Sequence, residues 1–196
     1  MKPRIRINSR EFDRAMGNYA KTIKSKVIPD SLNKQAPFVI LRAMKETTKT
    51  LTGRITSELG GIGRPTMLGR KIIFARARAK GIKLTHEAMI AAFNSMLNAR
   101  RAAVRYVSLG WLPALEGVGR KVARPLKSSS TASKEGGAKK ANKIIHKVTF
   151  WNGAPGILKV GKSALKSALS NSASNIRRFT LKRLDREAKK YKSNKR

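Results

Sequence analysis

An imbalance of charge constrains this chain more than any other feature. Its 196 residues include 45 lysines and arginines but only 10 aspartates and glutamates, which gives a net charge of +35 at pH 7. A field of that size makes copies of the isolated chain repel one another, and it favours association with nucleic acid, an anionic membrane or acidic proteins. Apolar residues make up 40% of the chain, which is enough for a hydrophobic core.

Apolar residues recur at spacings of three and four in several segments, and this pattern predicts a mainly helical chain. We expect the first helix to begin near Asn8 or Ser9 and to stop at Pro29. We expect the second helix to open at Pro37, which suits a first helical position, and to end at Gly60.

A third helix is predicted to begin at Thr85 as its cap and to break or kink at Pro113. Near its end, Trp111 falls on the apolar face and Gly110 removes bulk beside the ring. We rank three roles for Trp111: a core residue first, an interface anchor second and a base-stacking platform third. A fourth, long helix with a basic outer face is predicted over residues 163–191.

Extended structure is expected in two places. Residues 73–78 partly alternate in polarity, which predicts a short strand or extended arm with Arg76 and Arg78 on one side. Residues 144–151, IIHKVTFW, are typical of a strand, and the following Asn-Gly pair indicates a turn. The partner strand is expected in residues 154–160 or, alternatively, near 72–78. Phe150 and Trp151 then point to opposite faces, so that one of them faces solvent or a neighbour.

These elements predict an α+β fold, mainly helical, with about four long helices packed on a small antiparallel β-sheet. The helical part occupies residues 1–116, with a short extended segment near 70–84. Residues 117–143 are rich in serine, glycine and lysine, which is typical of a flexible basic loop. A strand or hairpin and the long helix of the same domain follow in 144–191, and residues 192–196 are expected to be a disordered tail.

The pattern of an enzyme is missing from the sequence. Without cysteine, the chain has neither disulfides nor thiolate zinc sites. His86 and His146 are far apart and the few carboxylates are scattered, so we predict no metal, no cofactor and no catalysis. A composite site that another chain completes around His86 and Glu87 is the remaining enzymatic alternative. No apolar run approaches the length of a bilayer span, so no membrane partner is expected.

Three stretches resemble virion proteins of tailed bacteriophages, of the neck, tail-completion or minor tail type. They are the opening helices FDRAMGNYAKTI and ILRAMKETTKTLTGRITSELG, the helix end RAAVRYVSLGWLPAL, and VTFWNGAPG before a long terminal helix. The resemblance implies an α+β protein that assembles as a ring or multimer at the head–tail junction, beside portal, tail or capsid proteins. It implies a place in the virion after assembly in the host cytoplasm, and no catalytic residues.

Two sets of residues are predicted to make interactions. Aromatic side chains anchor partner proteins, and the candidates are Trp111, Phe150, Trp151 and Tyr191. Cations contact a polyanion such as DNA without reading its sequence, and the candidates are Arg76, Arg78, Arg120, Lys121, Arg124, Lys139, Lys140 and Lys143. The alternative to a virion protein is a standalone basic nucleic-acid-binding protein of the ribosomal or nucleoid type.

Overall fold

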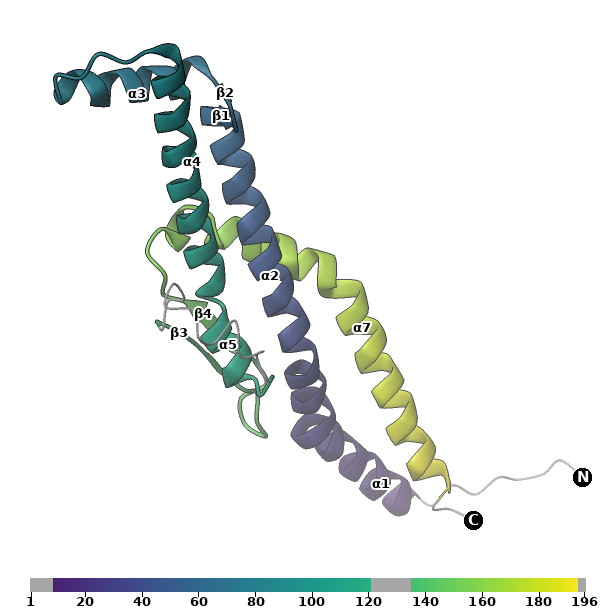
Figure 1. Ribbon diagram of the computed structural model, residues 1–196. Coiled ribbons are helices and arrows are strands. Elements are labelled where there is room, and N and C mark those ends of the chain that lie inside the picture. Colours follow the sequence, from purple (N-terminus) through teal and green to yellow (C-terminus); the bar gives the residue numbers. More distant parts are fainter. Residues whose placement is uncertain (1–8, 121–134, 194–196) are drawn as a thin grey trace, which may run out of the picture.

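The computed structural model describes residues 9–120 and 135–193, and its frame is a set of long helices (Figure 1). Helix α1 (Ser9–Thr22), a π-helical turn (Ile23–Val27) and helix α2 (Ile28–Leu59) follow one another without a break. Helix α4 (His86–Leu109) runs antiparallel beside the second half of α2. Helix α7 (Gly161–Ser193) runs antiparallel beside the first half, so that α2 is the central rod of an elongated molecule.

The predicted helix boundaries at Pro29 and Pro37 are wrong. Pro29 lies in the first turn of α2, and the turn before it is π-helical, with the Ile28 N–H donating to the Ile23 carbonyl oxygen. Pro37 lies inside α2, although an interior proline costs a helix about 3 kcal/mol. Its neighbours Ala36, Val39 and Ile40 are buried in the core, and this packing holds the helix together.

The predicted extended segment near 70–84 is also wrong, because residues 67–79 form helix α3 (Met67–Ala79). Thr66 caps this helix, and its Oγ1 accepts a hydrogen bond from the Gly69 N–H at 3.1 Å. Ile73 and Ala77, one turn apart, are buried. Strands β1 (Gly60–Gly61) and β2 (Arg64–Pro65) pair antiparallel and connect α2 to α3, which projects sideways from the frame (Figure 1).

A second small sheet lies beside the end of α4. Strand β4 (Thr149–Asn152) begins later than predicted, and it pairs antiparallel with β3 (Gly136–Lys139). Neither predicted partner is correct: residues 67–79 are helical, and residues 157–159 form a 3₁₀ turn (Ile157–Lys159). The true partner lies inside the stretch predicted as a flexible loop, of which residues 121–134 fall outside the described residues. Gly137 fits there because a side chain would collide with the ring of Trp151.

The predictions for the third and fourth helices and for the fold class are confirmed at their main points. Thr85 caps α4, and the helix ends before Pro113, which lies in the first turn of α5 (Leu112–Gly117). The long terminal helix is present and includes residues 192 and 193, which were predicted to belong to the tail; residues 194–196 lie outside the described chain. The class is α+β and mainly helical, with two antiparallel sheets of two strands each among the described residues.

Trp111 lies in the core, where only 3% of it is exposed. Its indole Nε1 donates a hydrogen bond to Thr47 Oγ1 on α2 at 3.0 Å, and its ring meets Phe150 edge to face at 6.3 Å between centroids. Gly110 is necessary at this point, because a side chain there would overlap Asn152 Oδ1 and lie 2.8 Å from Ala154 Cβ. The first-ranked role for Trp111 is therefore confirmed.

Candidate interaction surfaces

The four aromatic side chains predicted as interface anchors separate into three groups. Trp111 is buried, and Phe150 packs against the same core cluster. Trp151, on the other face of β4, is 44% exposed, which confirms that the two neighbours point in opposite directions. Tyr191 belongs to α7, but its side chain lies outside the described part of the structure. Trp151 is therefore the candidate that the structure leaves open to a neighbour.

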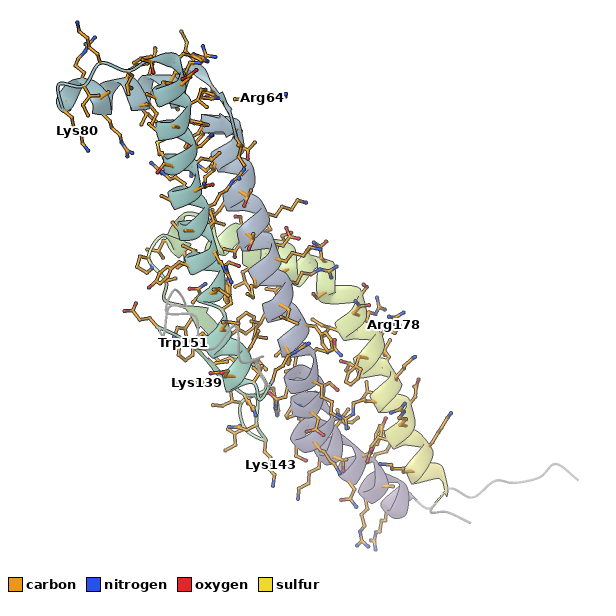
Figure 2. The ribbon with its side chains drawn as sticks, in the orientation of Figure 1. Arg64, Lys80, Lys139, Lys143, Trp151 and Arg178 are labelled. Atoms are coloured by element: carbon orange, nitrogen blue, oxygen red, sulfur yellow. The ribbon has the colours of Figure 1, made fainter. Side chains whose placement is uncertain are left out.

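The cations predicted to contact a polyanion lie in two separate places. Arg76 and Arg78 are exposed on α3. Near the small sheet, the structure exposes the other described members, which are Arg120, Lys139, Lys140 and Lys143. Figure 2 shows the same spread, with Arg64 and Lys80 near α3 and Lys139 and Lys143 near the sheet. Lys121 and Arg124 lie outside the described residues.

A group of exposed apolar side chains surrounds α3, and sequence analysis missed it. Its members, which we call the α3 surface, are Ile62, Met67, Leu68, Phe74 and Ile82. Met67 is 75% exposed and Phe74 is 50% exposed. Exposed apolar side chains gathered in one place mark contact sites more often than those scattered singly. The α3 surface is therefore a candidate site for another molecule.

The charged side chains of the stretch that contains the α3 surface are all positive. The sequence has no carboxylate between Glu58 and Glu87. The exposed cations of the same stretch are Arg64, Arg70, Lys71, Arg76, Arg78, Lys80 and Lys83. Met67, Lys71, Phe74 and Arg78 follow one another at spacings of four, three and four, which places them along one exposed face of α3. Apolar and cationic side chains thus share one outward face.

A groove of about 510 Å³ lies where α3 and the following loop approach α4. Its lining includes Ile73 and Ala77 of α3, Ile82 and Leu84 of the loop, and the stems of Arg76 and Lys80. The strand prediction missed both the groove and the outward face, because a period of two places Phe74, Arg76 and Arg78 on one side. The helical period places Phe74 with Met67 and Arg78, and places Arg76 at the groove with Ile73 and Ala77.

The carboxylates and histidines of the described residues do not gather around a common point. No group of three or more histidine, aspartate or glutamate side chains among them could hold a metal ion. His86 and Glu87 are exposed in the first turn of α4, where the negative charge suits the helix dipole. His146 is exposed, and its Nε2 lies 3.1 Å from the Lys143 carbonyl oxygen.

No helix in the described part of the chain is long and apolar enough to cross a membrane. Comparisons with protein-family models, curated proteins and solved structures found no match. A function is therefore inferred from three observations: the exposed apolar side chains, the net charge, and the three stretches that resemble phage virion proteins.

Proposed function

We propose that this chain is a non-enzymatic structural component of a tailed phage particle. Its place is the head–tail junction, as a neck, connector or tail-completion protein in a ring or multimer beside portal, tail or capsid proteins. The α3 surface carries this proposal, because it joins exposed apolar side chains to a rim of cations on a helix that projects from the frame.

The physical chemistry of the α3 surface favours an acidic protein partner. Full burial of a methionine, leucine or phenylalanine side chain contributes about 1.5–3 kcal/mol, so docking of these partly exposed side chains contributes on the order of 1 kcal/mol each. Cations around them attract a carboxylate-rich surface and fix its orientation. Acidic neighbours also offset the mutual repulsion of chains that each carry +35.

The shape of the molecule supports the same role. Its helices form an elongated frame, with α3 at one end and the start of α1 and the end of α7 near the other (Figure 1). Trp151 and the β3–β4 sheet lie apart from α3 (Figure 2). One chain thus offers surfaces to more than one neighbour, as a part that joins two assemblies must.

Genetic replacement in the phage that carries this gene tests the proposal. Without the protein, we expect heads and tails to accumulate as separate particles in electron micrographs. The Met67→Ser/Phe74→Ser variant should fold, because both side chains are exposed, but should restore few joined particles. The control Ile144→Ser/Leu158→Ser, which alters exposed apolar residues elsewhere, should restore them. Normal infectious particles in the absence of the chain would contradict the proposal.

The second candidate is a standalone nucleic-acid-binding protein of the ribosomal or nucleoid type. Exposed cations at both ends of the frame favour it (Figure 2). This function requires tight binding of the purified chain to nucleic acid, with a steep fall in affinity as salt rises. Weak binding with a shallow salt dependence would rule it out.

A further inference from the structure

The longest helices of the fold, α2 and α7, enclose a groove on one side of their contact. It has a volume of about 630 Å³. Its lining, which defines the α2–α7 groove, comprises Gln35, Phe38 and Arg42 of α2 and Ser172, Asn175, Arg178, Phe179 and Lys182 of α7. These lining residues include three cations, two aromatic rings and two amides, and none of the lining residues that the structure describes is acidic.

Among the described residues, the two guanidinium groups of this groove donate hydrogen bonds to uncharged acceptors and form no ion pair. Arg42 Nη1 donates a hydrogen bond to the backbone oxygen of Asn171 across the helix contact. Arg178 Nη2 donates to Asn175 Oδ1 at 3.2 Å. Both acceptors are uncharged, so the positive charge remains available to an anion. Of the carboxylates on these two helices, Asp30 forms an ion pair with Arg183 at 3.2 Å, and Asp185 lines a separate hollow on the other side of Arg178 and Lys182.

An exposed aromatic ring lies beside these cations. Phe38 is 58% exposed, although the residues that follow it, Val39 and Ile40, are buried. Arg42 is one helical turn away on the same face. The guanidinium carbon of Arg120 lies 5.8 Å from the centroid of the Phe38 ring, within the range of a cation–π contact. The Phe38 ring therefore lies next to cationic side chains, and more than half of the residue stays exposed.

This combination suits one class of ligand. Single-stranded nucleic acid is bound by grooves that track its phosphates with cations and stack its bases on aromatic rings. In α7, Arg178 and Lys182 are one turn apart and so present two successive positive charges. The groove is also within the usual size of a small-ligand site. A duplex keeps its bases stacked on one another and gains nothing from the exposed part of the Phe38 ring.

We propose that the α2–α7 groove binds single-stranded nucleic acid without sequence preference. An unpaired base stacks on Phe38, and the phosphates on either side contact Arg42, Arg178 and Lys182. The amides of Gln35 and Asn175 are placed to hydrogen-bond the base or sugar. This site goes beyond the proposed structural role and does not depend on it, because a particle component can bind a nucleic acid strand or lack that property.

A matched pair of variants tests the site in the full-length chain. The groove variant is Arg42→Gln/Arg178→Gln/Lys182→Gln, and the control Arg100→Gln/Arg101→Gln/Arg105→Gln removes the same charge from exposed positions of α4. Fluorescence anisotropy with labelled oligo(dT) across a salt series gives the affinity and its salt dependence. We expect the groove variant to lower the magnitude of the log–log slope by about 2 and to bind more weakly than the control. Equal losses in both variants would overturn the proposal.

The stacking step has its own test. Phe38→Ala should weaken oligo(dT) binding by about 5-fold to 100-fold and leave the binding of duplex DNA and heparin unchanged. An equal loss for duplex and heparin would overturn stacking. If polyglutamate binds with the same dependence on Phe38, the occupant is an acidic protein segment and the proposal fails.

Photo-crosslinking of the unaltered chain locates the bound oligonucleotide directly, so this test does not depend on whether the variants fold. An oligonucleotide that contains 5-iodouracil should crosslink to the peptide that carries Phe38, as identified by mass spectrometry. Crosslinks confined to α3 or to the small sheet would contradict the assignment.

Discussion

The hydrogen bond between Trp111 and Thr47 offers a test of how the core holds α2 against the end of α4. Thr47 is fully buried, and its hydroxyl accepts from the indole while donating to the Ala43 carbonyl oxygen at 2.7 Å. The hydroxyl thus satisfies the indole N–H at a place that water does not reach. A buried donor left without a partner costs about 1–3 kcal/mol.

A double-mutant cycle isolates this interaction. Thr47→Val should lower the free energy of unfolding by about 1–3 kcal/mol, because it keeps the shape of the side chain but leaves the indole N–H without an acceptor. Trp111→Phe should also cost about 1–3 kcal/mol, from the lost bond and the smaller ring. Once Phe is at 111, Thr47→Val should cost little, so the double variant falls short of the sum by about 1–2 kcal/mol.

Urea denaturation followed by far-ultraviolet circular dichroism measures all four proteins, because the signal does not depend on tryptophan. Thr50→Val, at an exposed position of the same helix, is the matched control and should change stability by less than about 0.5 kcal/mol. Strictly additive losses, with a coupling near zero, would show that the hydrogen bond is not formed as described.

Three further outcomes follow from the packing. Gly110→Ala should destabilise the chain by about 1–3 kcal/mol in urea, because the added methyl overlaps the side chain of Asn152. Gly53→Ala, on the exposed side of α2 with nothing within 4 Å, should stabilise it by about 0.5–1 kcal/mol. Asn33→Ala should speed hydrogen exchange at the Ala141 amide, because Asn33 makes two hydrogen bonds of 2.9 Å to that residue. The three predictions would be refuted, in turn, by an unchanged or raised stability of Gly110→Ala, a lowered stability of Gly53→Ala, and an unchanged exchange rate at the Ala141 amide.

Sequence analysis succeeded where the determining interactions are local. The cap at Thr85 and the helix end at Gly60 depend on residues within a turn of the boundary. The burial of Trp111 followed from apolar spacing along one helix. A few residues that are neighbours in the sequence determine these features, so the local sequence pattern is sufficient to predict them.

The predictions were wrong where contacts between residues far apart in the sequence determine the secondary structure. Buried neighbours keep α2 continuous through Pro37, and the close fit of Trp151 against Gly137 explains why a glycine-rich stretch pairs as β3. Neither contact is visible in the local pattern. The α2–α7 groove could not be predicted from the sequence, because Phe38 and Arg178 belong to helices that are far apart in the chain.

The proposal that this chain is a structural component of a tailed phage particle is tested most directly by quantitative mass spectrometry of purified particles. The account predicts the chain in intact virions of the phage that carries the gene, in a fixed ratio to the portal protein that does not change on further purification. Absence of the chain from intact particles, or a trace that falls with each purification step, would contradict the account.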